Sequence, residues 1–377
     1  MQSLALAWLI LDLTHSPFYL GLEGFANTIP ISIFSFYGGV IADRFNRKRL
    51  LIMTQWVMLV LATVLGILTQ LHIVRIWEII LLAFIGGLSQ SLAWPVYQTV
   101  MANVAERQHL SNAIALNSAQ FNMARTIGPV VGALGLQYFG TAGCFYANAV
   151  SFLAVIVALE SIHIPLNRHS PDVDGSGILQ TFREALAYMV SKKHLFWLLV
   201  IMAATSVLGV PMVTLLPAFA REVLHLDPSG LGSLMASFGA GAVLGGFLVA
   251  YLGDFVGKER FALRGEILFV AAMIVFSLLR NTLLCMIFLF LAGFSMVTFA
   301  SVVNSLVQSS VPENMRGRAM SLFVFAFGGC MPFGNLLAGW LAHLWSVPSA
   351  LLAQGCLLGL LVIYISISKF AKVETTI

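Results

Sequence analysis

Long apolar runs recur along almost the whole of this 377-residue chain, and they decide which solvent it can fold in. Apolar residues make up 59% of the sequence and charged residues only 10%, whereas an average soluble domain has about 25% charged residues. A hydrocarbon core needs roughly 20 apolar residues for each helical crossing. The strands of an outer-membrane barrel would instead show about 10-residue segments of strict alternation, which are absent from the sequence. We therefore expect an all-α membrane protein.

Twelve apolar segments are bounded by charges, glycines, prolines and asparagines, six on each side of one polar stretch. They cover residues 1–13, 18–42, 50–70, 75–100, 112–138, 142–162, 195–219, 229–252, 261–279, 283–307, 318–344 and 348–370. We predict twelve transmembrane helices in two pseudo-symmetric six-helix bundles, over residues 1–164 and 195–377. Residues 165–194 form a cytoplasmic linker between them. Its turn residues and amphipathic run fit an interfacial helix and a mere tether equally well.

Basic residues are distributed unevenly over the alternate loops. Sixteen of the twenty fall on one side of the predicted bilayer, three on the other (Arg75, Arg221 and Arg280), and Arg125 lies inside a span. Lys and Arg collect on the cytoplasmic side of inner membranes. We therefore expect a multi-pass protein of the bacterial plasma membrane, with loops 42–50, 101–111 and 165–194 and the C-terminus in the cytoplasm.

The two predicted bundles repeat one short pattern. Asp43 follows the second span and Asp254 the eighth, each followed by basic residues, at an offset of 254 − 43 = 211 residues. Applied to Leu195, where the seventh span begins, this offset places the start of the first span seventeen residues before Met1. Thirteen helical residues cover only about 20 Å of a roughly 30 Å hydrocarbon core. The first helix is therefore expected to be truncated, with an in-frame extension upstream of Met1.

Residues 39–49 resemble the loop signature G-x-x-x-D-R-x-G-R-[RK] of the major facilitator superfamily. The matching motif residues are Gly39, Asp43, Arg44 and Arg47. The resemblance implies that Asp43 caps the eleventh helix, where unpaired N–H groups and the helix dipole favour a carboxylate, and so latches the cytoplasmic gate. Asn46 stands where the family has Gly, a replacement tolerated because Asn enters left-handed conformations more readily than most residues.

The second bundle carries a copy of this motif at residues 253–258. It keeps Asp254 and Gly257 but has Phe255 where the first copy has Arg44. We expect its latch to be the weaker one.

The fifth span contains a second resemblance, to the G-P-x-x-G core of a signature found in export-type members of the superfamily. It is carried by Gly128, Pro129 and Gly132. Pro removes a backbone hydrogen bond and Gly permits close helix approach, so this segment is expected to bend and slide against a neighbour. Residues 11–17, 110–118 and 311–318 are similar to the branch that contains bacterial macrolide exporters and the enterobactin exporter.

Polar side chains within the spans indicate a cavity. A charge at mid-bilayer costs at least ~2.5 kcal/mol, so Arg125 needs a partner or a wet cavity, either as a substrate contact or as a structural pin. Amides on the fourth and fifth spans could line such a cavity beside stacking aromatic rings. The candidates are Arg125, Asn117, Gln120, Gln90 and Trp94, with Asn304 on the facing wall.

Proton coupling usually needs an acid or His that alternates between the two sides. Asp12 and Glu23 lie near the ends of the first two spans, and we expect no acid at the midplane. Glu23 is the first coupling candidate by elimination and Asp12 the second. No P-loop and no cluster with metal-ligand spacing occurs in the sequence, so we predict no enzyme activity, no cofactor and no metal.

The leading hypothesis is a monomeric secondary transporter that exports amphipathic drugs or siderophore-like molecules by alternating access, coupled to protons. Its partners would be the small-molecule substrate, protons and the lipid bilayer, with no nucleic acid. A lysophospholipid transporter is an alternative, since the superfamily includes such proteins and Arg125 could meet a phosphate. A receptor or non-transporting remnant is a third reading, suggested by the short first helix.

Overall fold

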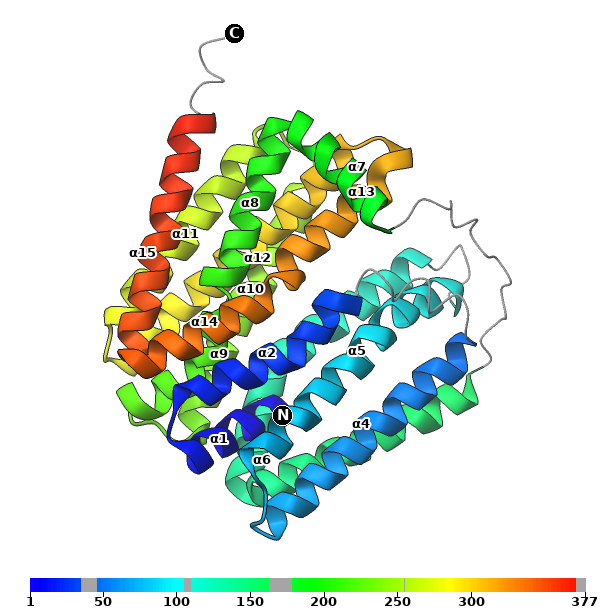
Figure 1. Cartoon of the computed structure of the whole chain (residues 1–377), viewed down its shortest axis with the longest axis vertical. Coiled ribbons are helices and arrows are strands. Elements are labelled where there is room, and N and C mark those ends of the chain that lie inside the picture. The colour runs from blue at the N-terminus through cyan, green and yellow to red at the C-terminus, as the bar shows by residue number, and fades with distance from the viewer. Residues whose placement is uncertain (35–45, 105–109, 163–177, 254, 371–377) are drawn as a thin grey trace.

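The computed structural model describes residues 1–34, 46–104, 110–162, 178–253 and 255–370, all of whose regular structure is helical (Figure 1). For some helical residues, Arg125 among them, it describes the backbone but not the side chain. The helices are α1 Gln2–Thr14, α2 Pro17–Phe34, α4 Arg47–Gln70, α5 Ile76–Val104, α6 Leu110–Ser161, α7 Ile178–Ser191, α8 Lys193–Leu208, α9 Pro211–Ala218, α10 Pro228–Leu252, α11 Lys258–Leu278, α12 Thr282–Ser310, α13 Glu313–Val324, α14 Met331–Leu344 and α15 Val347–Ile365. Short π-helical segments follow three of them: η2 Phe219–Val223, η3 Phe325–Gly329 and η4 Ser366–Phe370.

Nine helices among the described residues are long and apolar enough to cross a membrane. One of them, over Thr126–Ser161, turns back at Gly140, whose φ of 68° and ψ of −177° are not helical. This residue therefore separates the expected fifth and sixth spans. The expected all-α membrane fold is confirmed, and each of the twelve expected spans overlaps a described helix. The count of twelve crossings and the division at residues 164 and 195 stay predictions.

Two of the long spans are interrupted. In the span over Lys193–Val223, α8 ends at Leu208 and α9 begins with Pro211, which has no backbone N–H to continue the helical ladder. In the span over Met315–Leu344, the segment η3 and Cys330 separate α13 from α14. Such breaks are the positions where a helix changes direction with least loss of hydrogen bonding.

Close backbone crossings at glycine hold neighbouring helices together. A Cβ atom added at Gly21 of α2 would overlap the Asn335 carbonyl and lie 2.8 Å from the Cα of Gly339 on α14. Helices α10 and α12 cross in the same way, because a Cβ at Gly241 or at Gly293 would overlap the opposite backbone. Small residues at a crossing let two backbones approach closely, which is a main source of helix association in lipid.

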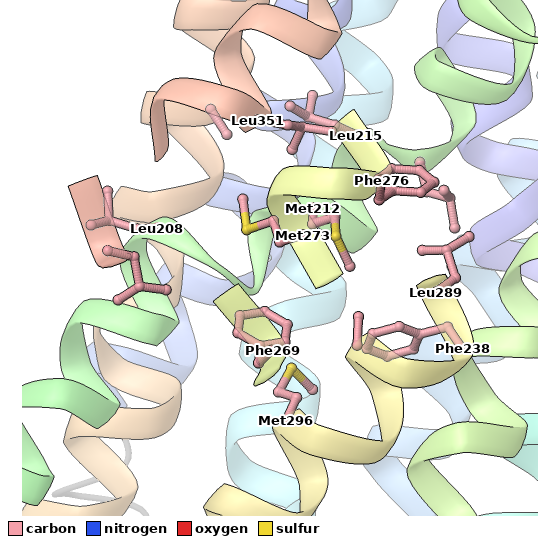
Figure 2. Packing of buried hydrophobic residues seen from close by; sticks show 14 of the residues in the cluster. Leu208, Met212, Leu215, Phe238, Phe269, Met273, Phe276, Leu289, Met296 and Leu351 are labelled. Atoms are coloured by element: carbon pink, nitrogen blue, oxygen red, sulfur yellow. The ribbon is translucent and has the colours of Figure 1, made fainter. Parts of the chain in front are cut away.

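The largest buried apolar cluster among the described residues runs through both halves of the chain, and many of its members come from α8 to α12 and α15. Figure 2 shows Phe269, Met273 and Phe276 of α11 projecting among Met212 of α9 and Leu289 of α12. The rings of Phe276 and Phe219 lie 4.4 Å apart between centroids. These side chains fix α11 against the interrupted α8–α9 span.

The glycine crossing between α2 and α14 gives a stability prediction. Gly21→Ala should destabilise the folded protein by ~1–3 kcal/mol, the usual cost of overpacking, because the added methyl group meets backbone rather than a movable side chain. Gly246→Ala is the matched control, since its Cβ would meet only a Val297 methyl at 3.8 Å. Thermal unfolding in detergent measures both variants, and equal midpoints for the two would contradict the crossing as described.

Candidate functional site

The helices run between two ends that differ in charge. The end that we call the basic end carries the starts of α4 and α11 and the helix α13. Its described basic residues include Arg47, Lys48, Arg49, Lys258, Arg260, Arg316 and Arg318. The opposite end, which we call the closed end, carries the last turns of α1 and α14 and the segment η2. In Figure 1 the helices α2 and α14 lie side by side between these ends.

An ion pair joins the first and second halves of the chain at the closed end. Arg221 of η2 donates through Nη1 to Oδ1 of Asp12 on α1 at 2.6 Å. The guanidinium carbon of Arg221 also lies 5.5 Å from the centroid of the Trp8 ring, a cation–π contact. Asp12 is the second coupling candidate, and the structure places it in a contact that holds two helix ends together. Its coupling role stays a prediction.

Further contacts between the halves reinforce the closed end. Ser16, just after α1, lies 3.1 Å from Nδ1 of His343 on α14. Deeper in the interface the hydroxyl of Ser32 donates to the carbonyl of Gly329 at 2.9 Å.

At the closed end, Asp227 caps the start of α10 within its own turn. It accepts from the Gly230 N–H and the Ser229 hydroxyl, and these donors hold its pKa below the usual range.

A cavity of about 540 Å³ lies between α4, α5 and α6. Each helix contributes one face, since the lining positions are spaced by three or four residues and therefore lie one above another. The lining is formed by Leu51, Thr54, Gln55, Met58, Ser89, Gln90, Ala93, Trp94, Tyr97, Asn117, Gln120, Ala124 and Phe152. These described residues combine amides and hydroxyls with aromatic and aliphatic surface and include no charged side chain. Four of the expected cavity residues are thus brought together: Gln90, Trp94, Asn117 and Gln120.

Two contacts order the aromatic wall of this cavity. The hydroxyl of Tyr97 donates to Oδ1 of Asn117 at 2.7 Å and so ties α5 to α6. The rings of Trp94 and Tyr97 stack with centroids 6.4 Å apart and planes inclined by 29°. Trp94 is still half exposed where it lines the cavity.

A second cavity, of about 270 Å³, lies between the two halves of the chain. It is lined by Met1, Ser3, Leu4, Ala124, Gly128, Pro129, Val213, Leu216, Met235, Phe238 and Gly239. Because Ala124 lines both cavities, they adjoin at this residue. Together they extend from α4 to α10 past the first residues of α1.

The start of α1 lies against α6, between the two cavities' shared residue Ala124 and the turn at Gly140. A Cβ at Gly132 would lie 3.0 Å from the Cα of Met1, which places the start of α1 beside Gly132. The cavity residues Asn117 and Ala124 precede Gly132 by fifteen and eight positions, or about 12–22 Å along α6. A continuation of α1 that followed α6 would therefore run toward the larger cavity. The upstream extension stays a prediction.

Most of the expected gating motif lies outside the described residues. This holds for Gly39, Asp43 and Arg44 of the first copy and for Asp254 of the second. Its described members, Arg47 and Gly257, stand at the starts of α4 and α11. The left-handed conformation expected for Asn46 is wrong: its φ of −63° and ψ of 112° are extended, and its side chain accepts from the Arg49 N–H at 3.2 Å. Gly257, by contrast, is left-handed with a φ of 88°. Helix α4 thus starts with the side-chain cap of Asn46, whereas α11 starts after the left-handed Gly257.

The G-P-x-x-G segment lies where the halves meet. Gly132 accommodates Met1, and a Cβ on Gly232 of α10 would lie 3.1 Å from the Pro129 carbonyl. The non-helical dihedrals within α6 are those of Gly140, away from this segment. Bending at Gly128 and Pro129 stays a prediction.

The remaining candidates are dispersed. Asn304 lies on α12, accepts from Gln308 at 2.5 Å and does not line either cavity. Glu23 is half-buried on α2, and no hydrogen bond or ion pair links it to another described residue. The side chain of Arg125 lies outside the described part of the chain.

One functional candidate was missed. Glu266 of α11 is fully buried and stands within an apolar span. The signal was present, because Glu266 stands five residues inside the apolar segment that begins at Phe261, the same depth that made Glu23 a candidate.

The sequence profile of a family described as transmembrane secretion effectors matches residues 1–376. The chain belongs to the major facilitator superfamily. It is therefore a membrane transporter and not an enzyme, and the resemblance seen in its motifs is confirmed. The Staphyloferrin A transporter of Staphylococcus aureus is 22% identical over 347 residues, which are 91% of this chain and 86% of that protein. The multidrug efflux pump Tap of Mycolicibacterium fortuitum is 22% identical, covering 96% and 90%.

Solved structures share the fold at low identity. A mutant form of the nucleoside transporter NupG has a TM-score of 0.76 at 13% identity, and the match covers 97% of this chain and 95% of that one. A bacterial homologue of the human lysosomal transporter Spinster, in an inward-facing and unoccupied conformation, has a TM-score of 0.74 at 13% identity, covering 97% and 91%.

The ion pair at the closed end gives a prediction about opening. With 30% and 46% of the two side chains exposed, a pair such as Arg221–Asp12 contributes ~0.2–1 kcal/mol. Asp12→Asn and Arg221→Gln should each increase the open fraction up to about fivefold. The open fraction is measured with Leu216→Cys, a position that lines the smaller cavity, in a protein whose four native cysteines have been replaced. The rate at which an impermeant maleimide labels this cysteine reports how often the closed end opens.

The exchange of the two charges is the control. Asp12→Arg combined with Arg221→Asp should return the labelling rate most of the way to its original value, since the pair is restored in reverse. Single variants that are labelled no faster than the parent would exclude a gating role for the pair.

Proposed function

We propose that this chain is a secondary active exporter that moves amphipathic small molecules out of a bacterial cell by alternating access, in exchange for protons. The named relatives include a Staphyloferrin A transporter, a multidrug efflux pump and a macrolide efflux protein from Streptococcus pyogenes, the last 19% identical over 94% of this chain. The family supports transport, and these relatives favour export.

The distribution of charge supports the orientation. Lys and Arg cluster at the basic end, whereas Arg75, Arg221 and Arg280 are the basic residues at the closed end in the described chain. The positive-inside tendency therefore favours a cytoplasmic basic end and a closed end at the outer face. A bacterial plasma membrane fits the organisms of the relatives.

The single observation that carries the proposal is the pairing of a sealed closed end with adjoining cavities at the interface. Asp12–Arg221, Ser16–His343 and the glycine crossing of α2 with α14 join the halves at one end. The two cavities lie further from that end: the larger lies between α4, α5 and α6, and the smaller lies between α6, α9 and α10. Alternating access requires a state of this kind, in which one gate is shut around a site near the midplane.

The lining of the larger cavity indicates the substrate class. Amides and hydroxyls in the lining offer hydrogen-bond donors and acceptors, and the Trp94 and Tyr97 rings add aromatic surface. None of the described lining residues is charged. A flat or macrocyclic molecule with dispersed polar groups fits this chemistry better than a sugar or an inorganic ion.

Export can be tested in bacteria that lack their own major efflux pumps. Cells that express the chain should accumulate less ethidium and less erythromycin than cells with an empty vector, and an uncoupler should abolish the difference. The combined variant Gln90→Leu with Asn117→Leu should reduce export about tenfold or more, because each change removes a hydrogen bond whose net contribution is ~0.5–1.5 kcal/mol. Gln308→Leu, an amide outside both cavities, should export normally.

Accumulation equal to that of the vector control, with the protein demonstrably in the membrane, would refute export. A version with enough apolar residues before Met1 to complete a ~20-residue crossing tests the role of the larger cavity. If that version exports and the Gln90 and Asn117 changes leave it unaffected, the substrate contacts lie in the smaller cavity instead.

The two copies of the loop motif give a further prediction. If Asp43 caps a helix across the interface, Asp43→Asn should lower export while leaving insertion intact, with a loss set by a terminus interaction of ~0.3–2 kcal/mol. Asp254→Asn should lower it less, since Phe255 stands where the first copy has Arg44. Transport per inserted molecule is the measurement, and equal losses from both changes count against the asymmetry.

A further inference from the structure

Glu266 is an acid buried in the interior of the second half of the chain. It lies on α11, eight residues after Lys258 and so about 12 Å along the helix from its start. None of its surface is exposed to solvent. A buried charge is costly without a partner, and such an acid within a membrane span is a functional candidate by default.

The contacts around Glu266 are those that a protonated carboxyl can complete. Oγ1 of Thr205 lies 2.6 Å from Oε1 of Glu266 and 2.9 Å from the carbonyl of Ile201. A hydroxyl has one hydrogen, and a carbonyl can only accept. Both contacts are therefore hydrogen bonds only when Glu266 carries a proton and donates it to Thr205, which in turn donates to Ile201. Oε2 of Glu266 has no hydrogen-bond partner among the described residues.

In the described part of the chain no opposite charge faces this carboxyl. Arg264 is exposed and stands two residues away, on another face of α11. The helices packed against Glu266 are α8, α12 and α15. Their titratable groups are Lys193 and His194 in the first turn of α8, the buried Cys285 in the first turn of α12, and Cys356 and Tyr364 on exposed positions of α15. His194 faces Glu259 instead, at 3.9 Å.

Thr205 stands at the break of the span that Glu266 touches. Its carbonyl accepts from both Gly209 and Val210, the two residues between α8 and α9. A Cβ on Gly209 would lie 3.0 Å from Cζ of Phe269, which is one turn after Glu266 on α11. Helix α11 therefore meets the break at two points: the carboxyl of Glu266 contacts Thr205, and the ring of Phe269 packs against Gly209.

We propose that Glu266 is a proton-binding site whose occupancy sets the geometry of the break between α8 and α9. With a proton bound, the chain of hydrogen bonds from Glu266 through Thr205 to Ile201 is complete. When the proton leaves, the carboxylate takes the hydroxyl hydrogen of Thr205 away from Ile201 and needs a further donor, so the break must rearrange or admit water. This site would couple protons to export, and in that role it rests on the proposed function.

The transport arm uses the purified full chain in phospholipid vesicles and follows the initial rate of ethidium uptake. An acidic lumen should accelerate uptake by the parent protein. Glu266→Gln keeps the shape of the side chain but cannot lose a proton, so its rates with and without the gradient should be equal. Gln354→Met is the matched control, because Gln354 is also buried, has no hydrogen-bond partner in the described chain and carries no titratable proton.

Thr205→Val keeps the inference testable if Glu266→Gln inserts poorly. It should retain the response to the gradient but shift its pH midpoint upward. Both forms of the carboxyl lose their bond to the hydroxyl, but the bond to the ionised form is charge-assisted and therefore the stronger one. An unchanged midpoint would overturn the link between Thr205 and Glu266.

An infrared arm needs no transport. Difference spectra between about pH 5 and about pH 9 should show a protonated-carboxyl band in the parent that is missing in Glu266→Gln. Identical spectra for the two proteins would overturn the proton site. Gradient-driven uptake that is unchanged in Glu266→Gln would overturn its coupling role alone, whereas a parent protein that moves neither ethidium nor erythromycin would overturn the proposed export.

Discussion

Contact between helix backbones at glycine is the interaction on which the rest of this structure depends. In a bilayer, lipid tails are as apolar as leucine, so burying an apolar face gives little reason for two helices to associate. Where Gly21 meets Gly339, and Gly241 meets the backbone of α12, the helices approach closely enough for dispersion and weak hydrogen bonds to act. The crossing of α2 with α14 then brings α1 and η2 within reach of each other. The ion pair of the closed end is a consequence of that approach.

Much of the fold follows from composition and period alone. The apolar runs predict the helices, because the bilayer permits few other structures for a chain without alternation. The spacing of Gln90 and Trp94 on one helix, and of Asn117 and Gln120 on the next, predicts that each pair shares a face. That both faces point into one cavity followed from the reluctance of amides to meet lipid. These predictions need only the geometry of a single helix and the polarity of its surroundings.

Pairings between distant segments were not accessible in this way. Asp12 lies 209 positions from Arg221, and nothing local to either residue selects the other. Asn46 was expected to substitute for the conformation of a glycine, but its side chain provides a cap instead, which achieves the same helix start by a different bond. Glu266 was overlooked although it stands as far inside its apolar segment as Glu23 does. Its full burial depends on the helices that pack against α11, and the sequence of one helix does not show which of its faces they cover.

The closed end has very little chain between its helices. Two residues separate α1 from α2, one residue turns α6 back on itself, three separate α11 from α12, and two separate α14 from α15. In the proposed orientation this is the face that the cell presents to its surroundings. Such a surface offers almost no loop that an antibody or a phage could bind or a protease could cleave. Anything that recognises this protein from outside must bind the rims of its helices, and those rims move each time the gate opens.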